Sequence, residues 1–113
     1  MKRLFLNNEE IFISRYNNCI NTEKEDYELY LTLNIKDAAE YKEACKIKDI
    51  KPGDILKFSA SNSLVRITTE IEVQEQVSYC LNPDDFLNNV ASMHFKFMIK
   101  NEVKEDIKDL TEI

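Results

Sequence analysis

Histidine, the side chain that most often acts as a catalytic acid or base, is scarce in this sequence. His94 is the only histidine, so there is neither a pair of imidazoles for a metal ion nor a second imidazole base. Alternation places His94 on the polar side of a strand, beside Lys96 and Lys100. No GxSxG motif and no recognisable cysteine-protease neighbourhood occurs. We therefore interpret His94 as a surface residue and assign no catalytic residue.

Glycine is as scarce as histidine, and this bears on phosphate and cofactor binding. Gly53 is the only glycine among 113 residues. Phosphate-binding loops need several glycines so that backbone amides can approach the phosphate groups. The sequence therefore excludes a P-loop or dinucleotide-binding motif in its usual form, and it predicts no cofactor.

Carboxylates are plentiful, and one arrangement matches a catalytic pattern. Pro83-Asp84 followed by Glu102-Val103-Lys104 is similar to the motif of PD-(D/E)xK nucleases, where two acids hold a divalent metal ion and a lysine positions water. In that family these residues end adjacent core strands. Here Asp84 is predicted in the first turn of a helix and Glu102 in a polar tail. A carboxylate-metal nuclease is therefore the last of three functional hypotheses, and no metal ligand is assigned.

Composition bounds the class of protein. With 43% hydrophobic residues and a net charge of −6, the chain predicts a single domain over residues 1–113 and disfavours non-specific binding to nucleic-acid backbones. The three cysteines form no CxxC pair, so we expect buried thiols in a reducing compartment. No segment approaches the roughly 18 apolar residues of a membrane span. We therefore expect a cytoplasmic protein without a membrane partner.

The longest two-residue alternation spans residues 64–79 and predicts the strand around which the chain is organised. Its odd positions are mostly apolar and predict a buried face, whereas its even positions are polar and predict a solvent-facing one. At about 3.3 Å per residue, a single strand over this whole segment would be longer than a typical strand. We therefore expect it to bend or bulge, at Thr68-Thr69 or at Glu75, which places a charge on the apolar face.

Shorter patterns predict the other elements. Strands are expected near residues 3–14, 27–35, 55–60 and 93–100, a loop over 15–26, and helices over 38–47 and 83–92 after caps at Asp37 and Asn82. The predicted fold class is α+β: a single small domain with a mainly antiparallel sheet or partly closed β-barrel, two short helices and a C-terminal amphipathic segment. The predicted core is Leu29, Leu31, Leu33, Tyr41, Cys45, Ile55, Phe58, Val65, Ile67, Ile71, Val73, Phe86, Val90, Phe95 and Phe97.

The segment from Ile50 to Phe58, IKPGDILKF, predicts a type II turn that leads into a strand. It resembles the glycine–aspartate turn before a strand in small β-barrels such as PUA-like and ASCH domains, many of which bind RNA. The upstream glycine–lysine element of ASCH domains is missing here. The resemblance implies nucleic-acid binding as the second hypothesis, which requires exposed aromatics such as Tyr30 to lie beside four basic residues, Lys48, Lys51, Lys57 and Arg66.

The leading hypothesis is a non-catalytic protein-interaction module: an adaptor, an inhibitor or a component of a larger assembly. The partner would be another protein, a second copy of the chain, or both. One expected contact surface is the polar face of the 64–79 strand, and the other is the apolar stripe of the tail, which is too short to be a stable helix alone. The predicted binding residues are Arg66, Glu70, Glu72, Gln74, Gln76, Val103, Ile107 and Leu110.

Overall fold

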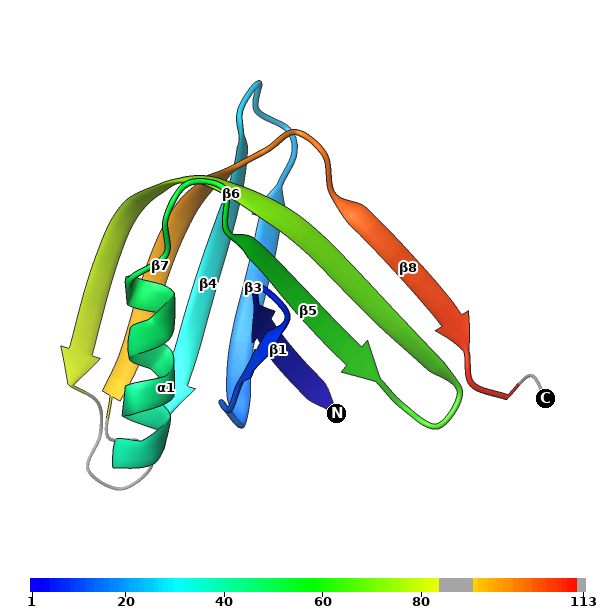
Figure 1. Cartoon of the computed structure of the whole chain (residues 1–113), viewed down its shortest axis with the longest axis horizontal. Helices are drawn as coiled ribbons and strands as arrows, with labels where there is room; N and C mark the ends of the chain where they lie inside the picture. The colour runs from blue at the N-terminus through cyan, green and yellow to red at the C-terminus, as the bar shows by residue number, and fades with distance from the viewer. Residues whose placement is uncertain (84–90, 112–113) are drawn as a thin grey trace.

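Alternating apolar and polar residues place most of the chain in antiparallel strands (Figure 1). The structure is a computed structural model that describes residues 1–83 and 91–111. The strands predicted near 27–35, 55–60 and 93–100 and the helix predicted over 38–47 are confirmed. The elements within the described residues are β1 (Lys2–Leu6), β2 (Glu9–Ile11), β3 (Arg15–Asn21), β4 (Tyr27–Ile35), α1 (Ala38–Lys48), β5 (Ile55–Ser61), β6 (Val65–Pro83), β7 (Ala91–Ile99) and β8 (Lys104–Asp109).

One long strand, β6, joins two halves of a single sheet. The strand order is β2-β1-β5-β6-β7-β4-β3, and β8 pairs with the first part of β6. We call β2, β1, β5, the first part of β6 and β8 the first half-sheet, and the rest of β6 with β7, β4 and β3 the second half-sheet. Figure 1 shows β6 bending over the top of the molecule between them. The sheet is not closed into a barrel, so the barrel alternative is wrong.

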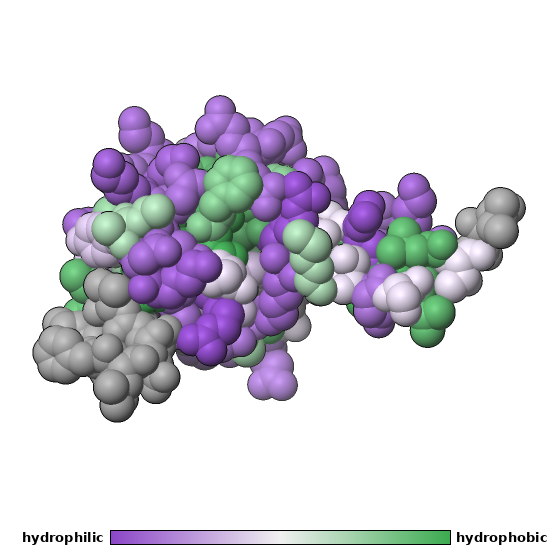
Figure 2. Space-filling model, turned by 90° about the horizontal axis from the view of Figure 1, so that it is seen from below, coloured by the Kyte–Doolittle hydropathy of each residue, from purple (hydrophilic) through white to green (hydrophobic). Residues whose placement is uncertain are grey.

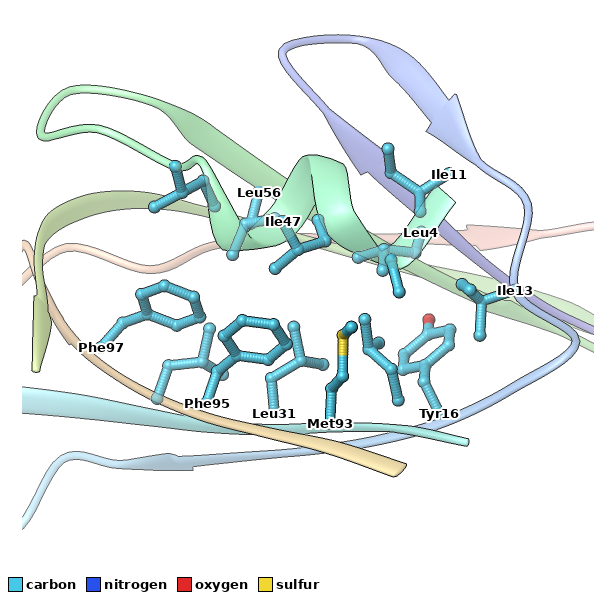
Figure 3. Close-up of a cluster of buried hydrophobic side chains, with 14 of the residues drawn as sticks. Leu4, Ile11, Ile13, Tyr16, Leu31, Ile47, Leu56, Met93, Phe95 and Phe97 are labelled. Carbon is cyan, nitrogen blue, oxygen red and sulfur yellow. The ribbon is translucent and has the colours of Figure 1, made fainter. Parts of the chain in front are cut away.

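The core lies between the inner faces of the two half-sheets. In Figure 3, Leu4 and Leu56 point toward Phe95 and Phe97 from the opposite side of the core, and Ile47 joins them from α1. The second half-sheet contributes every second residue of β4 and β7, as alternation predicts. The buried hydrophobic residues are Leu4, Ile11, Ile13, Tyr16, Leu29, Leu31, Leu33, Ile35, Ala44, Ile47, Ile50, Leu56, Phe58, Ile71, Val73, Ala91, Met93, Phe95, Phe97 and Ile99.

Several predicted core residues lie elsewhere. Tyr41 and Ile67 are exposed, and three others are half-buried: Cys45, Ile55 and Val65. Phe86 and Val90 lie outside the described residues. The prediction of buried thiols is also wrong for Cys19 and Cys80, which are exposed. Alternation identifies the face of a strand but not how far the opposing layer extends over it.

The helix α1 does not turn the predicted core residues Tyr41 and Cys45 fully into the core. Asp37 caps it as predicted, because its Oδ1 accepts a hydrogen bond of 2.9 Å from Glu40 N. Glu40, which is not among the predicted core residues, is buried together with Ala44 and Ile47. Its carboxylate accepts hydrogen bonds from Lys36 N at 3.0 Å and from Ser14 N at 2.8 Å. Two backbone donors therefore hold this charge in a buried position and fix the helix to the chain before β3.

Two irregularities bend β6, and they flank Glu75. The register with β7 shifts between Val73 and Glu75 and again between Gln76 and Ser78. The first shift moves Glu75 opposite Met98, on the outer face, so the charge does not enter the core. The predicted bend at Thr68-Thr69 is wrong, because both residues pair in regular register with β5 and β8.

The N-terminal segment forms a hairpin, as the interrupted apolar runs at 3–14 predict. Asn7 and Asn8 connect β1 to β2 with φ angles of 50° and 70°, values that asparagine tolerates in a two-residue hairpin loop. The loop predicted over 15–26 is wrong in its first part, because β3 pairs with β4 there. The burial of Tyr16 favours this pairing. Tyr16 is the one buried residue of β3, and the others are exposed or half-buried.

Two further predictions concern the C-terminal third. The tail is not a helix, because residues 104–109 form β8 beside β6. Most of the helix predicted over 83–92 lies outside the described residues, and its two ends belong to strands β6 and β7. Within the described part of the chain, no helix has the length and apolar character needed to span a membrane.

Candidate functional site

The first half-sheet extends past the core as a projecting arm (Figure 1). We define the arm as residues 60–70, which form the end of the β5–β6 hairpin, and residues 104–110, which include β8. The hairpin end is fixed locally: Asn62 Oδ1 accepts hydrogen bonds from Leu64 N at 2.8 Å and Val65 N at 2.9 Å. Met1 adds a further restraint, because its carbonyl accepts a hydrogen bond of 2.9 Å from Ser61 N. The arm is therefore an ordered ladder of strands.

Large apolar side chains lie exposed on both faces of the arm. Leu64 is 60% exposed and Ile107 is 61% exposed, while Ile67 and Leu110 are 38% and 37% exposed. Ile67 lies directly opposite Ile107 on the inner face, and Leu110 N donates a hydrogen bond of 2.8 Å to Leu64 O. Figure 2 shows hydrophobic residues on the projecting part of the molecule. Exposed apolar groups gathered in this way are typical of contact surfaces.

The inner face of the arm is open because the second half-sheet ends before it. Tyr16 of β3 covers Phe58, with ring centroids 5.8 Å apart. Ala60 and Ile67 lie opposite each other one step farther along the ladder. A shallow hollow of about 180 Å³ lies there, lined by Ala60, Ser61, Asn62, Val65 and Ile67. Residues that alternation assigns to the core are therefore open to solvent at this end.

The outer edge of the arm is the backbone of β8. Leu110 N donates to Leu64 O, and Leu64 and Leu110 are directly opposite each other in the register. In an antiparallel ladder the residues that bond to the neighbour alternate with those that point away. Even-numbered residues of β8 therefore bond to β6, and the N–H and C=O groups of Glu105, Ile107 and Asp109 point outward. β6 is the only described strand that pairs with β8.

Comparisons with protein families, curated proteins and solved structures found no match.

The predicted binding residues do not form one surface. Arg66, Glu70 and Glu72 lie on the outer face of the first half-sheet, where Glu70 is opposite Lys57 on one side and Lys104 on the other. The other predicted residues on β6 are separated from them by the bulges. Gln74 lies at the first bulge, and Gln76 is opposite the buried Phe97, on the inner face.

The three tail residues also separate. Ile107 and Leu110 belong to the arm, whereas Val103 is half-buried against the core. Leu64 was not predicted as an exposed residue, and Ile67 was predicted in the core, although both are exposed on the arm. The polar turn at Asn62 indicated that Leu64 is exposed, because a residue that follows a hairpin turn lies at the end of the ladder.

The basic residues proposed for nucleic-acid binding do not gather beside Tyr30, although Lys57 and Arg66 share the outer face of the first half-sheet. The Lys48 ammonium lies 5.1 Å from the ring of Tyr79, and the Lys57 ammonium lies 4.7 Å from the ring of Phe5. Tyr30 instead has Lys96 beside it, at 5.6 Å. These contacts lie on different parts of the molecule, so the described residues give no observation that favours this hypothesis.

The polar face of the second half-sheet holds a carboxylate paired with two ammonium groups. Glu28, only 3% exposed, lies 2.8 Å from Lys96 Nζ and 2.9 Å from Lys24 Nζ. These ammonium groups, Lys96 foremost, lower the pKa of Glu28. His94 is held between hydroxyl groups, with Nδ1 3.1 Å from Thr32 Oγ1 and Nε2 3.2 Å from Ser92 Oγ. Such a network fixes side chains on a sheet surface.

Candidate metal ligands do not gather within residues 1–83 and 91–111. No group of three or more His, Cys, Asp or Glu side chains there is arranged to hold a metal ion. Asp84 of the nuclease-like motif lies outside the described residues. An open cavity of about 590 Å³ is lined by Met1, Lys2, Ser14, Arg15, Tyr16, Asn17 and Asn34, which include no carboxylate, imidazole or thiol. Ser14 therefore has no such base within this cavity.

Proposed function

We propose that this protein is a non-catalytic interaction module whose contact surface is the projecting arm. The observation that carries the proposal is the exposure of Leu64, Ile67, Ile107 and Leu110 on a rigid ladder beyond the core. Each isoleucine or leucine left in water forgoes part of the roughly 1.5–3 kcal/mol that full burial of such a side chain provides. A partner that covers the arm recovers this free energy.

The composition of the arm suits a reversible protein contact. Ile67 and Ile107 form an apolar centre on the inner face. On this face the charged side chains of Glu105 and Asp109 flank Ile107, while Lys104, Asp106 and Lys108 carry charges on the outer face of the same strand. An apolar centre within a polar rim is the usual organisation of such interfaces, where the centre gives affinity and the rim gives orientation.

A capture experiment with matched variants tests the proposal. Leu64→Glu and Ile107→Glu place a charge on the arm at positions that are already mostly exposed, so both variants fold. Val77→Glu is the control, because Val77 is 45% exposed on the same strand β6 but outside the arm. Each immobilised protein is incubated with extract of the native host, and the bound proteins are identified by mass spectrometry.

The expected result is that the wild type and Val77→Glu retain the same partners, including added soluble wild-type chain, and that both arm variants lose them. If the arm variants retain every partner of the wild type, the contact surface lies elsewhere. If the wild type retains neither another protein nor its own chain, the proposed function is wrong.

A further inference from the structure

We propose that β8 pairs in antiparallel orientation with β8 of a second copy, with Ile107 opposite Ile107. The two first half-sheets then form one continuous sheet across a two-fold axis. This inference rests on the proposed function, because it names a partner for the arm. Three features of the arm support it: the direction in which the backbone N–H and C=O groups of β8 point, the charges along that strand, and the exposed isoleucines.

The backbone phase allows this pairing. Glu105, Ile107 and Asp109 direct their N–H and C=O groups away from β6, as the Leu110–Leu64 hydrogen bond establishes. In a two-fold pair centred on Ile107, the two Ile107 residues exchange two hydrogen bonds. Glu105 of each copy exchanges two more with Asp109 of the other. All the outward backbone groups of these three residues therefore find partners, and none of the bonds to β6 is broken.

The charges along β8 favour this register over its neighbour. With Ile107 at the centre, Asp106 lies opposite Lys108 of the second copy, and this pair occurs twice. A register shifted to centre on Asp106 would place Asp106 against Asp106 and Lys104 against Lys108. Like charges directly opposite each other destabilise a sheet, whereas opposite charges stabilise it. Registers centred nearer the strand ends would pair fewer of the six residues of β8.

The exposed isoleucines supply the apolar contact. Ile107 and Ile67 share the inner face of the arm, so the two-fold axis brings two copies of each together as one cluster. The carboxylates of Glu105 and Asp109 oppose association, because they lie opposite each other on this same face. Asp109 Oδ1 partly offsets this, since it accepts hydrogen bonds from Thr111 N at 2.9 Å and Thr111 Oγ1 at 2.6 Å. A small contact that combines apolar attraction between isoleucines with repulsion between carboxylates predicts a weak, reversible dimer.

Charge exchange tests the register. Asp106→Lys alone places two lysines opposite each other in each pair, and Lys108→Asp alone places two aspartates opposite each other. Each single variant is expected to associate about tenfold more weakly than the wild type, or worse. When the two variants are mixed, a chain of one kind meets a chain of the other. Each heterodimer contains two cross-strand pairs of positions 106 and 108. One pair joins the two introduced side chains and the other joins the two native side chains. In each pair a lysine lies opposite an aspartate. The mixture is therefore expected to form a heterodimer, measured by sedimentation velocity over a concentration series.

A backbone variant tests the edge independently of charge. Ile107→Pro removes one outward N–H and leaves the hydrogen bonds to β6 in place, because proline is tolerated where the N–H of an edge strand faces solvent. This variant is expected to remain folded by circular dichroism and to be monomeric.

Several results would overturn the inference. The wild type could remain monomeric at every concentration, the Ile107→Pro variant could dimerise as well as the wild type, or the mixed charge variants could fail to associate. If the wild type is monomeric but its arm still captures a different protein, the self-pairing is wrong and the proposed function stands.

Discussion

Ile67 and Ile107 lie directly opposite each other on β6 and β8, and both remain exposed although they pair across the ladder. Every residue of β8 is exposed, so the strand is held by its backbone hydrogen bonds and this one apolar pair. The arm should therefore contribute little to the stability of the core.

Truncation before Lys104 tests this relationship. Removing residues 104–113 keeps Val103, which packs against the core, and discards only the exposed strand and the residues after it. We expect the free energy of unfolding to fall by no more than about 2 kcal/mol, since exposed ladder bonds and one half-exposed pair are lost. Urea denaturation measures the change. A truncated chain that no longer folds would show that β8 is part of the core.

A charge in the buried face of β6 should unfold the domain. Ile71 is 1% exposed, and Ile71→Asp buries a carboxylate without a partner. Glu70→Ala is the control on the opposite face and should change stability by no more than about 0.5 kcal/mol. Thermal melts followed by circular dichroism compare the two. If Ile71→Asp melted at the same temperature as the wild type, the two faces of β6 would be assigned the wrong way round.

The carboxylate of Glu40 should matter more than that of Glu43 on the same helix. Glu40 accepts hydrogen bonds from two backbone N–H groups, those of Ser14 and Lys36. Glu40→Ala leaves both without a protein acceptor, so we expect a loss of about 2 kcal/mol or more. Glu43 accepts from one exposed backbone donor, Phe12 N, and Glu43→Ala should cost less than about 1 kcal/mol. Equal losses in urea denaturation would contradict this account of the helix position.

The fold was predictable from sequence where one face of a strand is fully covered. β4 and β7 pair along their whole length and lie at the centre of the second half-sheet, so their alternation is regular and their boundaries could be read closely. The bulges of β6 left one signal, the charge of Glu75 on the predicted apolar face. The alternation otherwise continues through them, because the two shifts near Gln74 and Val77 cancel and Tyr79 returns to the inner face. β8 was mistaken for a helix, since spacings of three and four residues among three apolar side chains do not exclude a strand.

The candidate site was predictable only in part, for a related reason. Ile107 and Leu110 stood out as apolar residues in a charged tail. Ile67 could not be separated from the core, because its exposure depends on where the second half-sheet ends. That boundary is set by the contact between Tyr16 and Phe58, which lie far apart in sequence.

Alkaline pH should destabilise the protein through Tyr16. Burial raises the pKa of Tyr16 to about 12 from a usual value of 10.0, and its hydroxyl donates a hydrogen bond of 2.9 Å to Arg3 O. The unfolded chain loses this proton first, so the stabilising contribution is intact below about pH 10 and is lost as pH rises toward about 12. Urea denaturation at about pH 9 and about pH 11 should show a smaller decrease in Tyr16→Phe than in the wild type. An equal decrease in both would assign the effect to other groups.

The central claim is that the arm is a contact surface with β8 at its edge, and residue-resolved amide hydrogen exchange tests it most directly. Exchange is measured at low and at high protein concentration. We predict that the outward amides of Glu105, Ile107 and Asp109 become more protected at high concentration, whereas those of β3, at the far edge of the second half-sheet, do not change. Unchanged exchange along β8, or new protection only at β3, would contradict the claim.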